Sequence, residues 1–217
     1  MFATEIDGAY VMNSCGACLG VLLLTLLGGC QQERNDPPMP LPAVDLSFEL
    51  VDESGDAVTA DDYSGTLRLV FFGYTSCPDI CPLTLQNIAI ALDSLKSLAR
   101  QVTVLFISVD PKRDTPERLA RYTDAFHSSI VGLTGTHEQI TAVTNGFRTT
   151  FGYSLYDVDG QTRPLERDEY NLLAPTAAYT PYHGSQVYVI GHNDELLDII
   201  GYGSKPKQIE VILRKHL

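Results

Sequence analysis

Between Leu67 and Pro82 the chain reads LRLVFFGYTSCPDICP, and this segment gives the strongest indication of the fold class. Its first half, residues 67–74, is almost continuously apolar, which is typical of a strand buried on both faces of a sheet. Apolar residues then recur three and four positions apart, which predicts an amphipathic helix. These residues are Leu85, Ile88, Leu92, Leu95 and Ala99. A buried strand that leads directly into a helix indicates an α/β sheet.

The segments around this stretch extend the pattern. Residues 44–51 alternate roughly as a strand, turn at residues 53–56 and return over residues 57–60, which predicts a β-hairpin. Residues 102–109 are a second apolar run and predict another buried strand.

Two further helices are indicated by their capping residues. Asp114 or Thr115 can cap a helix that opens with Pro116, because proline suits the first helical position. Thr136 and Gln139 have the spacing of a capping box, which predicts a short third helix.

The C-terminal part of the chain predicts a long loop followed by a hairpin and a helix. Residues 152–182 are irregular, rich in tyrosine and acidic. Residues 186–191 and 196–201 predict a second hairpin, and residues 206–217 predict a closing helix. We therefore expect one domain over residues 44–217, an α/β thioredoxin-like sandwich with an N-terminal β-hairpin extension.

The first 43 residues predict an export signal and a tether. Residues 19–27 form a nine-residue apolar run, which has the length of a signal-peptide core and is too short to span a bilayer. The run ends in Leu-Gly-Gly before Cys30, which resembles a bacterial lipoprotein signal. We expect residues 1–29 to be removed and Cys30 to carry lipid. Residues 30–43 are polar and rich in proline, which predicts a flexible tether.

The segment before the apolar run departs from an ordinary signal. It contains no Lys or Arg, and Glu5 and Asp7 make it acidic. A start at Met12 instead of Met1 would remove both acids. A plain cleaved signal or a buried core segment remains as an alternative. The lipoprotein interpretation predicts an exported protein that a lipid anchors to a membrane, facing the periplasm or the cell exterior.

The composition excludes several classes of protein. Hydrophobic residues make up 44% of the 217 residues and charged residues 19%, unlike a disordered acidic tail or a multi-span membrane protein. With 27 acidic and 15 basic residues the formal net charge is −12, whereas nucleic-acid binding needs a basic surface. We therefore expect no nucleic-acid partner.

Two of the five cysteines, Cys77 and Cys81, remain as candidates for chemistry in the exported domain. Cys15 and Cys18 lie in the predicted signal, and Cys30 is assigned to the lipid. The remaining pair follows a buried strand and precedes a helix, where ligands bind in open α/β sheets. The helix dipole favours thiolates there. Because a proline follows each cysteine, we expect both on a tight loop ahead of the helix.

Three chemistries are open to such a pair: a redox disulfide, a metal site, or an attacking and a resolving thiol. The C-x-x-x-C spacing is one residue longer than that of thioredoxin, and a structural zinc site would need four ligands. Two sulfur ligands and one imidazole suit Cu(I) instead. An inert disulfide that closes a small loop is the structural alternative.

Among the five histidines, His183 is the candidate third ligand. It directly precedes the strand predicted at residues 186–191, and the loop entering that strand packs against the cysteine loop in a thioredoxin-like fold. The other four are expected to be ordinary surface residues. They are His127, His137, His192 and His216.

The combined motifs resemble the Sco/SenC family of copper proteins. They are FFGYTSCPDICP at residues 71–82, ISVDPKRDTPE at residues 107–117, GLTGT at residues 132–136, and the histidine before the second hairpin. The resemblance implies a thioredoxin-like fold with copper held by Cys77, Cys81 and His183. It also implies delivery of copper to the binuclear site of cytochrome c oxidase, or thiol reduction of that site.

Three further positions are judged against the family. Asp110 matches an acidic position near the metal loop, with a turn-forming role as the alternative, and a carboxylate is a poor ligand for Cu(I). Gly184 stands where the family usually has Ser or Thr directly after the histidine. Residues 157–180 are longer than usual, and we prefer a solvated insertion over a partner-docking loop.

The sequence therefore predicts a membrane-tethered copper metallochaperone. Its expected partner is the copper-bearing subunit of cytochrome c oxidase or another copper carrier. A thiol-disulfide oxidoreductase that uses Cys77 and Cys81 to keep the oxidase cysteines reduced is the alternative, and a peroxidase-like role ranks third.

Overall fold

The computed structural model describes residues 41–156 and 159–217. The predicted signal, most of the predicted tether, and Cys15, Cys18 and Cys30 lie outside the described residues. Among the residues that are described, no helix has both the length and the apolar character that crossing a bilayer requires.

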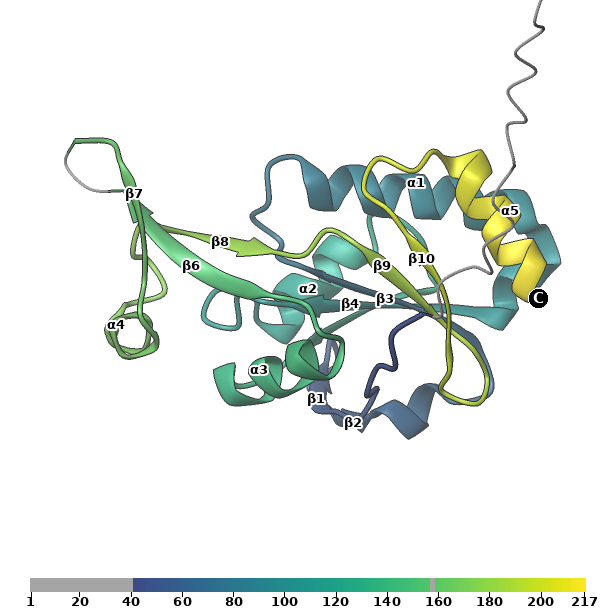
Figure 1. Cartoon of the computed structure of the whole chain (residues 1–217), viewed down its shortest axis with the longest axis horizontal. Helices are drawn as coiled ribbons and strands as arrows, with labels where there is room; N and C mark the ends of the chain where they lie inside the picture. The colour runs from purple at the N-terminus through teal and green to yellow at the C-terminus, as the bar shows by residue number, and fades with distance from the viewer. Residues whose placement is uncertain (1–40, 157–158) are drawn as a thin grey trace, which may run out of the picture. The chain divides into compact units, whose positions relative to one another are not determined.

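A mixed seven-stranded sheet forms the centre of the described domain (Figure 1). In sheet order its strands are β10 (Leu196–Ile200), β9 (Val187–Ile190), β3 (Leu67–Gly73), β4 (Val102–Ser108), β5 (Ile130–Thr134), β1 (Glu49–Asp52) and β2 (Ala57–Thr59). The β3–β4 and β4–β5 pairs are parallel, and the other pairs are antiparallel. The predicted α/β class and both predicted hairpins are thus confirmed.

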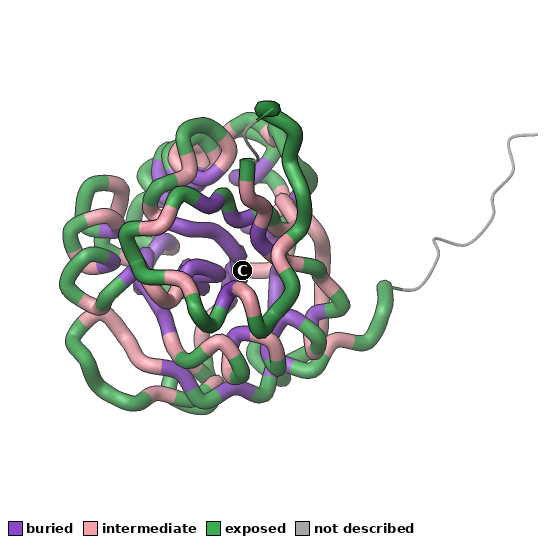
Figure 2. The backbone as a smooth tube through the Cα atoms, turned by 90° about the vertical axis from the view of Figure 1, so that its left-hand side faces the viewer, coloured by how far each residue is buried: buried purple, intermediate pink, exposed green. Residues whose placement is uncertain are grey.

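Helices cover both faces of this sheet. On one face, α1 (Ile80–Leu95), α2 (Pro116–Thr123) and α5 (Pro206–His216) contribute to one apolar core, and α3 (His137–Gly146) packs on the other face (Figure 1). The residues of β3 alternate between these cores: Leu69 and Phe71 face the first, and Val70 and Phe72 face the second. This burial on both faces explains the apolar run in the sequence. In Figure 2 the buried backbone accordingly lies inside a layer of exposed segments.

The predicted helix starts are also confirmed. The side chain of Thr115 accepts a hydrogen bond from the backbone of Arg118 at the start of α2. Thr136 and Gln139 form a reciprocal capping box at the start of α3. Two donors that a helix would otherwise leave unsatisfied at its N-terminus are paired in this way.

One strand of the central sheet, β5, was not predicted. Its sequence is Ile-Val-Gly-Leu-Thr, a run of only five residues between two helices. Pairing with β4 buries Ile130 and Leu133, so neighbouring strands in space, rather than a local turn signal, determine its conformation.

The expectation that residues 152–182 are irregular is wrong. The strands β6 (Phe151–Tyr156), β7 (Thr162–Pro164) and β8 (Tyr179–His183) form a second, antiparallel sheet in the order β7-β6-β8, which is accompanied by α4 (Arg167–Leu172). We call these four elements the aromatic arm, and Figure 1 shows them projecting from one side of the central sheet. Tyr153, Tyr170 and Tyr179 form its core, and the rings of Tyr153 and Tyr170 stack with centroids 3.7 Å apart. Three buried aromatic rings therefore give the arm a small core of its own.

Candidate metal centre

The two cysteines lie where the chain passes from β3 to α1. Cys77 is on the connecting loop, as predicted, and its N–H donates to the carbonyl of Tyr74 at 3.2 Å. Cys81 is instead in the first turn of α1, so the expectation that it lies on the loop is wrong. The helix includes the residue before Pro82 because a proline in the first turn gives up no helical hydrogen bond.

Packing at the end of β3 controls the position of Cys81, which is fully buried. A Cβ atom at Gly73 would lie 2.9 Å from the Cys81 sulfur and 2.5 Å from the ring of Phe106. Only glycine leaves room there for the cysteine side chain. Cys77 is partly exposed, so the pair presents one sulfur toward the surface and keeps the other inside.

His183 is the last residue of β8, and its side chain reaches the cysteine pair. Its Nε2 lies 3.5 Å from the sulfur of Cys81, and the backbone N–H of Cys81 donates to the sulfur of Cys77 at 3.5 Å. The ligand atoms of the three residues all lie within 4.8 Å of one another. In the part of the chain that the structure describes, they form the one cluster of at least three such side chains suited to a metal ion.

A backbone contact determines which nitrogen of His183 faces the sulfurs. Nδ1 lies 2.8 Å from the carbonyl oxygen of Gly184. A carbonyl oxygen only accepts hydrogen bonds, so Nδ1 carries a proton, and in the neutral imidazole the lone pair is then on Nε2, on the side of Cys81. Histidines that bind metals are commonly oriented by a hydrogen bond of this kind from the other ring nitrogen. The rings of Phe71 and Tyr74 contact the imidazole edge-on, at 6.1 and 5.8 Å between centroids.

Limited space explains why a glycine, Gly184, follows His183. A Cβ atom at Gly184 would overlap the hydroxyl oxygen of Thr149. The N–H of Gly184 also donates to the carbonyl of Thr150 at 3.0 Å. The departure from Ser or Thr at this position therefore accompanies a close approach of two backbone segments, and the ring of His183 still faces the cysteines.

The two thiols differ in the protonation state that their surroundings favour. A hydrogen bond from the Cys81 side chain lowers the pKa of Cys77 far below that of an ordinary thiol, and the backbone N–H of Cys81 acts in the same direction. The same pairing, together with burial, raises the pKa of Cys81. The pair thus combines a Cys77 thiolate with a Cys81 thiol. Binding one metal ion through both sulfurs would release the remaining proton.

Asp110 lies in the loop after β4 and does not belong to the ligand cluster. It is fully buried and accepts hydrogen bonds from the hydroxyl of Tyr179 and from Nε of Arg113, both at 2.5 Å. Burial raises its pKa, while these two partners act in the opposite direction. Its carbonyl oxygen also accepts from the backbone of Arg113 and Asp114, so Asp110 shapes the turn as well.

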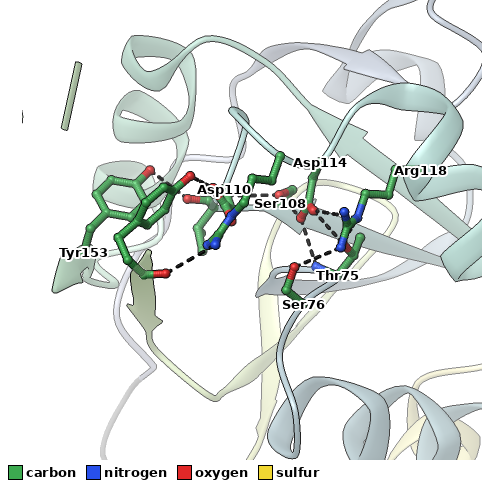
Figure 3. Close-up of polar contacts among 10 residues, drawn as sticks. Thr75, Ser76, Ser108, Asp110, Asp114, Arg118 and Tyr153 are labelled. Atoms are coloured by element: carbon green, nitrogen blue, oxygen red, sulfur yellow. Dashed lines mark hydrogen bonds and ion pairs between the residues drawn. The ribbon is translucent and has the colours of Figure 1, made fainter. Parts of the chain in front are cut away.

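Asp114 is a residue of the site that sequence reasoning considered only as a helix cap. It is fully buried, and its carboxylate accepts from the N–H of Thr75 at 2.9 Å, from the Thr75 hydroxyl at 2.5 Å and from the Ser108 hydroxyl at 2.7 Å (Figure 3). Thr75 begins the cysteine loop, so Asp114 holds that loop to the end of β4. Its position just after a buried strand was the available signal.

The remaining histidines are less exposed than predicted. Of the four, only His192 is exposed. His137 contacts the rings of Phe151, Tyr153 and Tyr170, and its burial lowers its pKa. His127 and His216 are half-buried and lie near carboxylates.

A mixed sheet with helices on both faces, and a Cys-Cys-His cluster whose cysteines follow β3, define a thioredoxin-like protein with a group placed to hold a metal ion. The SCO1/SenC family model matches residues 38–217. The chain belongs to the SCO1/SenC family.

Individual relatives agree with this assignment. The chain is 34% identical over 167 residues to the SCO2-like protein of Rickettsia felis, which covers 77% of this chain and 74% of that protein. The copper-bound structure of Bradyrhizobium japonicum ScoI is 30% identical with a TM-score of 0.66, and the match covers 81% of this chain and all of that one. Copper-bound yeast Sco1 is 27% identical with a TM-score of 0.67, and the match covers 81% and 88% of the two chains.

Proposed function

We propose that this chain is a copper chaperone that carries one Cu(I) ion on Cys77, Cys81 and His183 and delivers it to the binuclear copper centre of cytochrome c oxidase. The observation that carries the proposal is the convergence of the three ligand atoms within 4.8 Å. Copper in the structures of two relatives supports the metal. The client is supported by the solved protein BsSco, which is described as a member of the Sco family of cytochrome c oxidase assembly proteins.

The donor set fits a soft, low-coordinate ion. Thiolates and a neutral imidazole suit Cu(I), whereas the acidic side chains nearby are occupied by hydrogen bonds. In the proposed cycle, copper first meets the partly exposed Cys77 thiolate, and Cys81 then loses its proton as it binds. His183 completes the shell through Nε2. Release to a client reverses these steps, with Cys77 as the sulfur that a client ligand can reach.

The proposal places the protein outside the cytoplasm, held at a membrane by lipid on Cys30. Its support is the short apolar run that ends in small residues before a cysteine. Mass spectrometry of the mature N-terminus should find an acylated Cys30, and Cys30→Ser should release the protein from the membrane fraction. An unmodified N-terminus at another residue in native membranes would remove the anchor from the proposal.

A thiol-disulfide reductase is the second candidate, which the lowered pKa of Cys77 favours. The Cys77 thiolate would attack one sulfur of a client disulfide and release the other as a thiolate. The Cys81 thiol, after losing its proton to that departing thiolate, would then attack the mixed disulfide. A Cys77–Cys81 disulfide, one client thiol and one client thiolate result, so two electrons pass to the client.

Substitution of His183 separates the two candidates, because an imidazole ligand is needed for copper but not for disulfide exchange. His183→Ala should abolish complementation of oxidase assembly and leave reduction of a small disulfide largely intact. The matched control is His192→Ala, in the exposed hairpin turn, which should change neither activity. Normal oxidase assembly with His183→Ala would favour the reductase over the chaperone.

A further inference from the structure

The ligands of the proposed copper site come from two different sheets. Cys77 and Cys81 follow β3 of the seven-stranded sheet, whereas His183 ends β8 of the aromatic arm. Across the described residues, no backbone ladder joins the two sheets, and β8 is an edge strand of its own sheet. Strand pairing alone therefore does not set the distance between the histidine and the cysteines. The short link from His183 to β9 and contacts between the sheets contribute to it as well.

Side chains of the loop after β4 provide such a contact to β8. One carboxylate oxygen of Asp110 accepts a hydrogen bond from the hydroxyl of Tyr179, and the other accepts one from Nε of Arg113, each at 2.5 Å. The guanidinium of Arg113 lies 3.9 Å from the centre of the Tyr179 ring and donates to the Tyr179 carbonyl at 3.3 Å. We call Asp110, Arg113 and Tyr179 the clamp. Within the clamp, Asp110 and Arg113 contact both the side chain and the backbone of Tyr179.

Tyr179 and His183 lie on the same face of β8. Side chains alternate along a strand, so residues four apart point the same way, and here Tyr179 and Pro181 are buried while Thr180 and Tyr182 are exposed. Four residues of extended chain span about 13 Å. Holding Tyr179 at one end of β8 therefore determines the rotation and register with which His183 arrives at the other end.

The same loop, together with Arg118 of α2, holds the cysteine loop through a separate set of contacts. Asp114 accepts from the backbone and hydroxyl of Thr75, and Arg118 donates to the hydroxyls of Thr75 and Ser76, at 2.6 and 2.9 Å (Figure 3). Asp110 and Asp114 are both fully buried. One loop thus contacts the two halves of the site with different side chains.

We propose that the clamp residues are positioning residues for His183. They hold β8 so that Nε2 faces the cysteines, while Asp114 and Thr75 place the cysteine loop independently. This inference deepens the proposed function, because it rests on His183 as a ligand of the copper ion.

The test compares two readouts in the metal-free protein. The first is the nitrogen and proton NMR signals of the His183 imidazole, which report its hydrogen bonds and surroundings. The second is the rate at which iodoacetamide alkylates Cys77. Tyr179→Phe removes only the hydroxyl group that donates a hydrogen bond to Asp110. Tyr182→Phe is the matched control, because Tyr182 is on the exposed face of the same strand. Asp110→Asn is a second clamp variant that keeps the shape of the side chain.

Tyr179→Phe and Asp110→Asn should shift the His183 ring signals and leave Cys77 alkylation unchanged. Thr75→Val should change the rate of Cys77 alkylation and leave the His183 ring signals in place. Tyr182→Phe should change neither the ring signals nor the alkylation rate. With Cu(I) added, the two clamp variants should lose on the order of 10-fold in affinity, the usual cost of losing a partner that orients a ligand.

Two results would overturn the proposal. One is a His183 signal that Tyr179→Phe moves no more than Tyr182→Phe does. The other is a parallel change of both readouts in the clamp variants, which would show a general loss of structure. If Tyr179→Phe does not fold, Asp110→Asn decides between the outcomes. Because these readouts need no copper, they are independent of the proposed function, which fails instead if His183→Ala leaves copper binding and oxidase assembly intact.

Discussion

Cys77 and Cys81 are four residues apart, and their surroundings give them different chemistry. Cys77 is partly exposed and receives hydrogen bonds that lower its pKa, whereas burial and the neighbouring thiolate raise the pKa of Cys81. An accessible thiolate is a reactive group at the surface, and the buried thiol beside it retains a proton until a metal or a disulfide replaces it.

This difference predicts an unusual pH dependence for alkylation. An ordinary thiol has a pKa of about 8.5, so its thiolate fraction at pH 6.5 is about 100-fold below its plateau. Because the pKa of Cys77 is lowered, its thiolate is already formed at pH 6.5, and its alkylation rate should stay nearly constant from there to pH 8.5. Rates measured with iodoacetamide, with Cys77→Ser as the control, test this. A tenfold fall for each pH unit below 8.5 would contradict the lowered pKa.

Residue types and spacing were enough to indicate Cys77, Cys81 and His183 as candidate ligands. They did not reveal Asp114, because its partners Thr75 and Ser108 come from two other segments of the chain. The reason for Gly184 was equally hidden, since the hydroxyl that excludes a side chain there belongs to Thr149. Contacts of this kind depend on the tertiary fold and leave no local pattern.

At the scale of elements, the strongest periodic signals were predicted well and the short strands were not. The apolar run of β3 and the spaced apolar residues of α1 carry their own period, and both elements were predicted. β5 has only five residues, and its burial comes from pairing with β4. The aromatic arm was mistaken for a loop, although its tyrosines pack against one another and form a core.

The start of α1 shows a second limit of local rules. A residue before proline is disfavoured in a helix, and this rule predicted Cys81 on the loop. The first turn is the exception, because its N–H groups have no partners within the helix. Cys81 therefore enters the helix, where its backbone N–H is free to donate to the sulfur of Cys77.

For the molecule as a whole, the arrangement of two sheets matters more than any single element. The central sheet supplies the cysteines, the aromatic arm supplies the histidine, and the loop after β4 contacts both. The chain also carries a net charge of −12, which favours cationic cargo and basic partner surfaces over nucleic acid or anionic lipid. A cationic metal ion handed between proteins is compatible with that charge.

X-ray absorption on the copper-loaded domain tests the central claim most directly. One Cu(I) ion per chain should show a shell of two sulfurs and one light atom, supplied by Cys77, Cys81 and His183. Cys77→Ser and Cys81→Ser should each remove one sulfur and cost more affinity than His183→Ala, which should remove the light atom, because serine replaces a soft donor with a hard one. A shell that contains no sulfur, or one that Cys77→Ser leaves unchanged, would contradict the account.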